Sequence, residues 1–262
     1  HTSICEKVRL KKESCTNITI LTNRDLASHI ALTRLVQGLS DHQLNIFMSE
    51  KVGADHRVPQ PLMDLAAFEK RQIAAAKMSF DDLARLAGCE LQGFADIDNR
   101  VNGLEGLQRI RASAPELIIS VRFGLIIRDA VIAIPQYGVI NLHSGVLPSY
   151  RGVMATFRAM LNNEPEIGST LHYIQDAGVD TGDIISISQI PVDVDKSYLA
   201  NMLSLYAGGC AQIFQAVDQI QSGQVIAKQR QQGPAGYYSF PLDNELEIFF
   251  AQGYRLFDHK QY

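Results

Sequence analysis

The sequence predicts an α/β fold of the doubly wound type, in which a mostly parallel sheet is covered by helices on both faces. Three observations support this. Short apolar runs alternate along the chain with segments whose apolar residues recur at helical spacing. The run Leu117-Ile-Ile-Ser-Val-Arg122 is almost continuously apolar, as strands buried on both faces are. With 262 residues, 46% of them hydrophobic, the chain is also long enough to bury one large core.

The first unit of this fold is a strand, a turn and a helix. Asn17-Ile-Thr-Ile-Leu-Thr22 is a short apolar run, and the apolar residues that follow Asn23-Arg24-Asp25 recur at helical spacing. The turn between them has no G-x-G-x-x-G pattern, which argues against a dinucleotide site. Arg24 stands where the helix opens, and since a helix N-terminus favours anions, it is a candidate phosphate contact.

The remaining strands are predicted from short apolar runs, and the remaining helices from apolar residues at helical spacing. Further strands are predicted at 44–49, 91–97, 117–122, 138–142, 169–174 and 184–190. Helices are predicted up to about Lys77 and at 81–87, 103–114, 155–162, 198–220 and from about 244, with loops at 51–62, 123–127 and 231–241. We therefore divide the chain into a flexible N-terminal segment or tag remnant (1–16), a main catalytic domain (17–225) and a short C-terminal extension (226–262).

Composition excludes several classes of partner. The net charge of −4 gives no electrostatic reason to expect nucleic acid or a membrane surface. No apolar stretch approaches the roughly 20 residues that cross a bilayer, and the first residues lack the apolar core of a signal peptide. The four cysteines are far apart, with no C-x-x-C, so neither a metal site nor a disulfide framework is predicted. We expect a reduced, cytoplasmic chain, and the sequence leaves open whether it forms a homodimer.

The chemistry is predicted at the end of the strand that contains Asn141. Strand side chains alternate, so Asn141 and His143 point to one side, at the edge where an open parallel sheet keeps its active site. Alone, His143 is more often structural, Asn141 a turn residue, and the glycine-rich segment 176–183 an acidic turn. Together, an amide, an imidazole and a carboxylate form a set that can polarise a carbonyl and move one proton.

These residues also carry a resemblance to a known family. Asn141-x-His143, Leu147-Pro148, Arg151-Gly152 and Asp176-x-Gly-x-Asp180-Thr-Gly-Asp183 resemble the signature of the folate-dependent formyltransferases. That family includes glycinamide ribonucleotide formyltransferase, methionyl-tRNA formyltransferase and the N-formyltransferases of nucleotide-linked amino sugars. The resemblance is clearest from 117 to 192 and extends more loosely from 17 to about 223.

The chain departs from the family pattern at two places. The family usually has serine two positions after the histidine, whereas here Ser144 comes first and Gly145 second. The proline-containing segment that is common after Arg-Gly is replaced by Val153-Met-Ala-Thr-Phe157. Both departures leave the catalytic residue types intact, and they bear on which acceptor is used.

The resemblance implies N10-formyltetrahydrofolate as donor and no metal. Asn141 would donate its amide to the developing oxyanion, an effect worth about 2.7–4 kcal/mol elsewhere. His143 would help to shuttle the proton, and Asp180 would favour the imidazolium. His172 is expected to pack beneath the site. By analogy with the family, the donor would contact Phe123, Gly124, Leu125, Ile126, Ile127, Gln175, Asp176 and Gly178.

The resemblance leaves the acceptor open. Candidate contacts to it are Arg24, Arg122, Ser144, Tyr150, Arg151 and Gly152. For Arg122, the donor's glutamate tail, an acceptor phosphate and a surface carboxylate remain equal alternatives.

Comparison within the family narrows the acceptor. Methionyl-tRNA enzymes carry a basic C-terminal domain, whereas here about 40 residues follow Gly223 and the chain is acidic, so tRNA is disfavoured. Glycinamide ribonucleotide enzymes lack the extra residues at 50–100 and after 230. We therefore expect a small amine, such as a nucleotide-linked amino sugar or an amino-acid-like hydroxylamine. A deformylase that uses water, and a non-catalytic folate-binding paralogue, are the alternatives.

Overall fold

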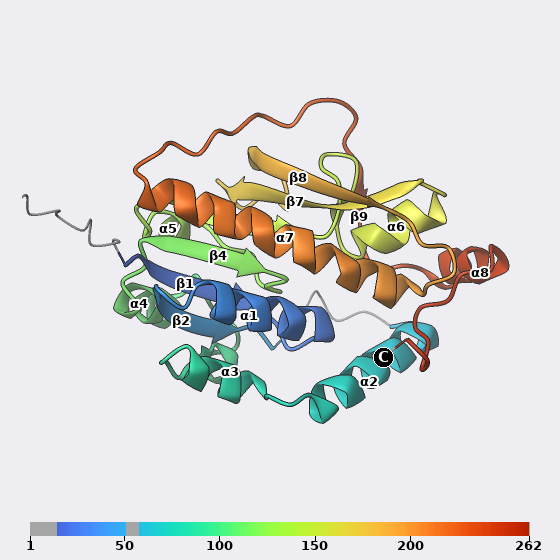
Figure 1. Cartoon of the computed structure of the whole chain (residues 1–262), viewed down its shortest axis with the longest axis horizontal. Coiled ribbons are helices and arrows are strands. Elements are labelled where there is room, and N and C mark those ends of the chain that lie inside the picture. Colours follow the sequence, from blue (N-terminus) through green and yellow to red (C-terminus); the bar gives the residue numbers. More distant parts are fainter. Residues whose placement is uncertain (1–14, 51–57, 262) are drawn as a thin grey trace, which may run out of the picture.

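A single mixed sheet forms the centre of the molecule in the computed structural model, which describes residues 15–50 and 58–261 (Figure 1). Its strand order is β3-β2-β1-β4-β5-β7-β8. The strands are β1 (Asn17–Thr22), β2 (Gln43–Met48), β3 (Leu91–Gly93), β4 (Leu117–Val121), β5 (Val139–His143), β7 (Glu166–Ile174) and β8 (Ile184–Pro191). The first five are parallel, whereas β7 is antiparallel to both β5 and β8. The predicted doubly wound, mostly parallel fold is confirmed.

Helices cover both faces of this sheet. On one face lie α1 (Leu26–Gly38), α2 (Gln60–Ala75), α3 (Phe80–Leu86), α6 (Ala155–Leu161), α7 (Tyr198–Gln221) and α8 (Asp243–Ala251), whose apolar residues share one large cluster. The other face carries α4 (Leu104–Ala112) and α5 (Asp129–Ile132), which share a smaller cluster. Figure 1 shows α7 lying along the sheet beside α1, with which it packs. Both faces are therefore buried, which explains the continuous apolar strands.

The order of the strands indicates where a ligand would bind. The chain runs outward from β1 to β2 and β3, and then returns to the other side of β1 with β4 and β5. Ligands of open α/β sheets bind at such a reversal, beyond the carboxyl ends of the strands. The residues that directly follow β1, β4 and β5 therefore meet at one edge.

Four elements differ from the sequence prediction. The predicted strand at 91–97 is only β3, because the chain turns at the fully buried Phe94 into a 3-10 helix, η1 (Ala95–Ile97). The short helix α5 was not predicted. Nor were the two-residue strands β6 (Arg151–Gly152) and β9 (Tyr237–Tyr238), which form a separate parallel ladder. The predictions for 1–14, and the part of the loop at 51–57, lie outside the described residues.

The C-terminal extension packs closely on the rest of the protein. The ring of Phe249, on α8, packs on the ring of Phe157, on α6, with 4.5 Å between the two ring centroids. Farther on, the backbone of Arg255 and Leu256 accepts hydrogen bonds from the start of α7, at 2.9 Å each. The segment between α7 and α8 therefore has fixed ends, and β9 lies within it. The proposed division at residue 225 remains a prediction.

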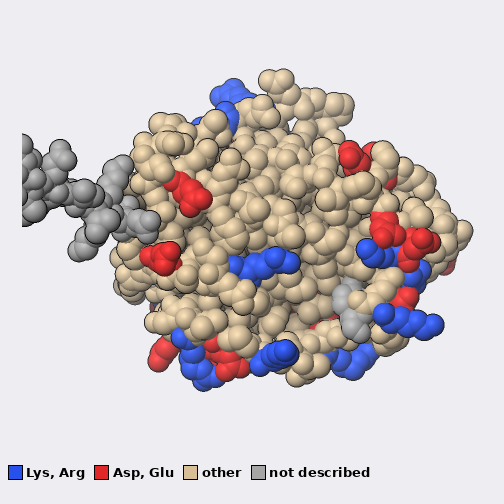
Figure 2. Space-filling view, viewed as in Figure 1, with Lys and Arg blue, Asp and Glu red and all other residues tan. Residues whose placement is uncertain are grey.

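Surface charge agrees with the small net charge. On the face shown in Figure 2, basic and acidic side chains are mixed, and neither sign forms a continuous patch. Among the described helices, none is long and apolar enough to cross a bilayer.

Candidate active site

A pocket of about 550 Å³ opens where β1, β4 and β5 end. Its volume lies within the range of small-molecule sites. The strand ends contribute Asn23 and Asp25 after β1, Arg122 to Gly124 and Ile126 after β4, and Asn141 to Ser144 from β5. The opposite walls come from α2, α7 and the C-terminal extension, through Leu62, Leu65, Ala66, Glu69, Tyr198, Met202, Tyr237 and Phe240. The segments at 50–100 and after 230 therefore help to shape the pocket.

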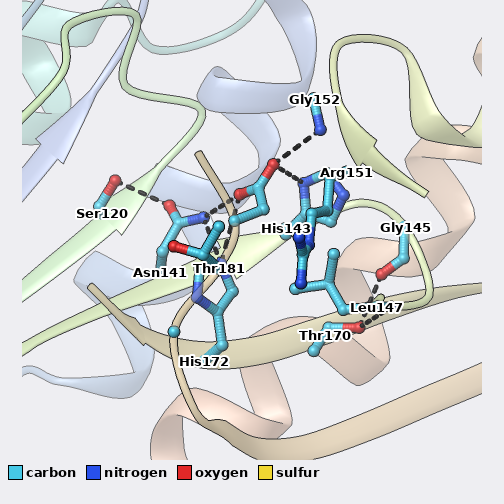
Figure 3. A network of polar contacts seen from close by, with 12 residues as sticks. Ser120, Asn141, His143, Gly145, Leu147, Arg151, Gly152, Thr170, His172 and Thr181 are labelled. Carbon is cyan, nitrogen blue, oxygen red and sulfur yellow. Dashed lines mark hydrogen bonds and ion pairs between the residues drawn. The ribbon is translucent and has the colours of Figure 1, made fainter. Parts of the chain in front are cut away.

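The carboxylate of Asp180 is the centre of a polar network in this pocket. Figure 3 labels its partners Asn141, His143, Gly152 and His172. Its Oδ2 atom lies 3.5 Å from Nδ1 of His143 and accepts the backbone N–H of Gly152 at 2.9 Å. Its Oδ1 atom lies 3.3 Å from Nε2 of His172 and 3.5 Å from Nδ2 of Asn141. The structure thus brings together the three predicted catalytic residues and adds His172 and Gly152.

The surroundings of Asp180 keep its carboxyl group ionised at neutral pH. Burial would raise the pKa of its carboxyl group, but His143, His172 and the N–H of Gly152 outweigh this and hold the pKa well below its ordinary value. The backbone of Asp180 has φ +54°, a left-handed conformation that aspartate tolerates better than most residues. The two histidines therefore face a fixed negative charge at neutral pH.

The hydrogen bonds define different roles for the two histidines. Nε2 of His143 lies 2.6 Å from the carbonyl of Tyr150, so it carries a proton, and Nδ1 faces the Asp180 carboxylate. Nδ1 of His172 lies 2.8 Å from the carbonyl of Tyr173, and its Nε2 lies 3.1 Å from Nδ2 of Asn141 and 3.3 Å from Oδ1 of Asp180. Both nitrogens of His143 thus face acceptors, whereas Nε2 of His172 contacts both the amide of Asn141 and the carboxylate of Asp180.

Ser120 fixes the orientation of the Asn141 amide. Its hydroxyl donates to Oδ1 of Asn141 at 2.8 Å, so the NH₂ group of Asn141 points towards Asp180. The two residues are direct partners in the β4–β5 ladder. Sequence reasoning missed Ser120, although it is the one polar side chain within the run Leu117–Val121 and that was the available signal.

Gly145 is required by close packing around His143. A Cβ atom on residue 145 would lie 2.5 Å from Cβ of Ala155, 2.6 Å from Nε2 of His143 and 2.8 Å from the carbonyl of Tyr150. A serine here would therefore displace the imidazole or the loop that it contacts. The close packing of His143 against residue 145 therefore explains why glycine, and not serine, occupies that position.

The C-terminal extension also contacts the loop at 176–183, which contains Asp180. Nε2 of Gln231 donates to the carbonyls of Asp180 at 2.7 Å and Gly182 at 2.8 Å, while its Oε1 accepts from Nη2 of Arg151 at 2.7 Å. Beside it, β9 pairs with β6, which contains Arg151 and Gly152. Nothing in the sequence pattern indicates these contacts, because they join residues far apart in the chain.

Arg122 is paired within the pocket wall. Its Nε donates to Oδ2 of Asp25 at 2.7 Å, and Oδ1 of Asp25 accepts the backbone N–H of Ser28 at 2.7 Å, which caps α1. Of the three alternatives for Arg122, the observed contact is with a carboxylate, and that carboxylate is largely buried. Sequence reasoning also missed Glu69, which lines the same end of the pocket.

Glu69 has an unusual titration. Burial and the nearby Asp25 raise its pKa from 4.5 to about 7, against the opposing effects of Arg122 and the Leu26 N–H. Between these two values the folded chain holds a proton that the unfolded chain has lost. Folding stability therefore decreases as pH rises through this window, and the loss is complete above about pH 7.

Glu69→Gln is accordingly expected to raise the melting temperature at about pH 8 and to change it least near pH 5. The exposed Glu247→Gln, on α8, is the matched control and is expected to behave alike at both pH values. Thermal unfolding followed by circular dichroism measures both variants. An equal effect of Glu69→Gln at the two pH values would contradict the raised pKa.

Several predicted contacts lie away from this pocket. Ile127 is buried in the smaller apolar cluster with Leu125 packed against it, while Gln175, Asp176 and Gly178 stand in a partly to fully exposed loop. Arg24 forms a half-exposed pair with Glu50 at 3.7 Å. Tyr150 lines a separate pocket of about 130 Å³, where its hydroxyl donates to Glu164 at 2.6 Å. By contrast, Phe123, Gly124, Ile126, Arg122, Ser144 and Gly152 line the main pocket.

Comparison with known proteins assigns the family. The family model described as formyl transferase matches residues 63–203, more than half of the 262-residue chain. The chain therefore belongs to the formyl transferase family, an enzyme family of one-carbon group transfer. The family expectation from the sequence is confirmed.

The relatives are similar to parts of this chain. Methionyl-tRNA formyltransferase of Chlamydia pneumoniae is 36% identical over 121 residues, which is 45% of this chain and 37% of that protein. The corresponding enzyme of Caldanaerobacter subterraneus is 27% identical over 169 residues, 64% of this chain and 54% of that one. The chain thus spans about half or less of the length of these curated relatives.

Solved structures share the fold. Glycinamide ribonucleotide transformylase 1 from Symbiobacterium toebii has a TM-score of 0.61 at 17% identity, covering 88% of this chain and 99% of that one. The N-formyltransferase from Helicobacter canadensis, in complex with folinic acid and dTDP-3-aminofucose, has a TM-score of 0.58 at 18% identity, covering 94% and 85%. At these identities the likeness establishes the fold alone.

Proposed function

We propose that the protein transfers a formyl group from N10-formyltetrahydrofolate to an amine of a small-molecule acceptor. The observation that carries this proposal is the contact of Asn141, His143 and His172 with the ionised Asp180, in a pocket at the strand ends. An amide donor, a proton-carrying imidazole and a fixed carboxylate are the groups that formyl transfer to an amine needs.

The roles of the side chains follow from their hydrogen bonds. Asn141 donates an N–H to the formyl oxygen as negative charge develops there, since Ser120 and His172 hold its amide in that orientation. His143, in its protonated form, gives its Nδ1 proton to the leaving folate nitrogen, and the neutral ring then takes up the proton that leaves the attacking amine, so the ring ends as it began. Asp180 supplies the fixed negative charge that Nδ1 of His143 faces at 3.5 Å.

The residues present fit the folate donor. The pocket wall formed by Phe123, Gly124 and Ile126 is apolar next to the polar network, which suits a flat ring whose reactive end must reach Asn141. When bound, the donor supplies the activated formyl group. The other predicted donor contacts, at Leu125, Ile127, Gln175, Asp176 and Gly178, remain proposals, as do those at Arg24, Tyr150 and Arg151.

The proposal is tested by incubating the protein with N10-formyltetrahydrofolate and a panel of small amines. We expect tetrahydrofolate to be released only when a suitable amine is present, and that amine to gain the mass of one CO by mass spectrometry. Release with water alone would instead indicate a deformylase. Donor binding without turnover across the panel, unchanged by Asn141→Ala, would indicate a non-catalytic folate-binding protein.

Gln231→Leu is expected to lower turnover about tenfold without unfolding the protein. The change removes the amide that holds the Asp180 and Gly182 carbonyls, so the carboxylate is less well positioned, and small misplacements are costly in catalysis. The exposed neighbour Gln232→Leu is the matched control. Wild-type turnover in Gln231→Leu would show that the loop holds its shape without this side chain.

A further inference from the structure

The wall of the pocket between α1, α2 and β4 contains three ionisable side chains, those of Asp25, Glu69 and Arg122. Two of them satisfy each other, because Asp25 accepts from Nε of Arg122 at 2.7 Å and its other oxygen caps α1. Glu69 has no such partner among the described residues. Its carboxylate interacts with the backbone N–H of Leu26 and with the charge of Arg122, which Asp25 already shares.

The charges that line the pocket do not balance. Three carboxylates, those of Asp25, Glu69 and Asp180, face one guanidinium and the imidazole of His143. Arg122 is paired with Asp25, and His143 lies beside Asp180. The unmatched group is therefore Glu69, and a buried carboxylate without a partner is costly unless it is protonated or meets a cation. The raised pKa of Glu69 is the expected response.

A buried hydroxyl group lies behind this wall. The side chain of Tyr206, on α7, is 2% exposed, and its hydroxyl has no hydrogen bond of good geometry among the described residues. Arg122 and Ser144, which both line the pocket, are its polar neighbours. Burial raises the pKa of Tyr206, so this neutral hydroxyl adds no charge that could balance Glu69.

We propose that the acceptor carries a second, cationic group, an ammonium in class, which Glu69 binds while the amine to be formylated lies at Asn141, His143 and Asp180. This inference rests on the proposed formyl transfer. An acceptor bearing phosphate would place two or more negative charges beside Glu69 and Asp25, with the one guanidinium already paired. Of the small acceptors expected from the sequence, an amino-acid-like hydroxylamine brings such an ammonium and, with its carboxylate, no net charge, whereas a nucleotide-linked sugar brings at least two negative charges to this wall.

The test uses three probes of equal chain length: cadaverine, pentylamine and aminopentyl phosphate. We expect kcat/KM for cadaverine to exceed that for the other two by at least about tenfold, the value of one hydrogen bond to a charged group. In Glu69→Gln this preference is expected to disappear, whereas Glu247→Gln keeps it. In Glu69→Lys we expect aminopentyl phosphate to become the best probe.

Binding provides a readout independent of turnover. Calorimetry is expected to give tighter binding of cadaverine than of pentylamine to the wild-type protein, and equal binding to Glu69→Gln. A wild-type preference for aminopentyl phosphate, or a cadaverine preference that survives Glu69→Gln, would overturn the inference while leaving formyl transfer intact. Failure of every amine to release tetrahydrofolate would overturn the proposed function itself, and the inference with it.

Discussion

An Asp180→Asn variant is expected to lose about 10³-fold in turnover while keeping its fold. The amide has the size of the carboxylate but no charge, so the imidazolium of His143 loses its counter-charge at 3.5 Å. The new NH₂ group would replace either Oδ1, which accepts from Asn141, or Oδ2, which accepts from the Gly152 N–H. In either orientation a donor would therefore face a donor. The loss is therefore expected in kcat, because the charge acts on the group that moves the proton.

The measurement is the rate of tetrahydrofolate release with a saturating amine, with circular dichroism to confirm the fold. Asp195→Asn is the matched control, since Asp195 is an exposed aspartate in the β8–α7 connection. Turnover within a few-fold of wild type in Asp180→Asn would remove this carboxylate from the mechanism.

Replacing Asn141 by alanine is expected to lower kcat by about 10²–10³-fold, as when one donor to a developing oxyanion is removed elsewhere. The change deletes the N–H groups that Ser120 and His172 orient towards the pocket. It also leaves the Ser120 hydroxyl and Nε2 of His172 without their shared partner. The effect should exceed that of Ser120→Ala, which removes the orienting contact but leaves the donor in place.

Steady-state kinetics of the two variants decide between catalysis and binding. A donor that acts on developing charge lowers kcat, whereas one that binds the ground state and the transition state equally raises KM alone. An increase in KM with unchanged kcat in Asn141→Ala would therefore show that Asn141 only holds the donor. Equal losses in Ser120→Ala and Asn141→Ala would place the effect in the β4–β5 contact.

The polar network was predictable where it follows strand geometry. Asn141 and His143 lie two residues apart, and strand alternation alone puts their side chains on one face. Asp180 came from a recognised motif, and the structure places it between them. His172 was expected to pack beneath the site, and it does so, buried in β7, but it also contacts Asn141 and Asp180, because β7 pairs with β5 opposite Asn141.

The contacts that the sequence did not predict depend on tertiary structure. Gln231, Glu69 and β9 reach the site from segments separated from it by tens of residues, and no local pattern records such distances. The strand predicted at 91–97 was too long for a related reason. Phe94, Ala95 and Ile97 are apolar enough for a strand, but in the structure Phe94 is buried against Phe47 and the chain then turns into η1.

The β6–β9 ladder determines when, during synthesis, the carboxylate of Asp180 can reach its final position. Gly152, whose N–H contacts Asp180, is held by backbone pairing to Tyr238, and Gln231 holds the loop at 176–183 through the carbonyls of Asp180 and Gly182. The ribosome adds Tyr238 about 85 residues after Gly152, and Gln231 about 50 residues after Asp180. The carboxylate of Asp180 therefore reaches its final position only after residues 231–238 have been made. Nascent and prematurely terminated polypeptides that lack Gln231 and Tyr238 should therefore not carry out the proposed formyl transfer.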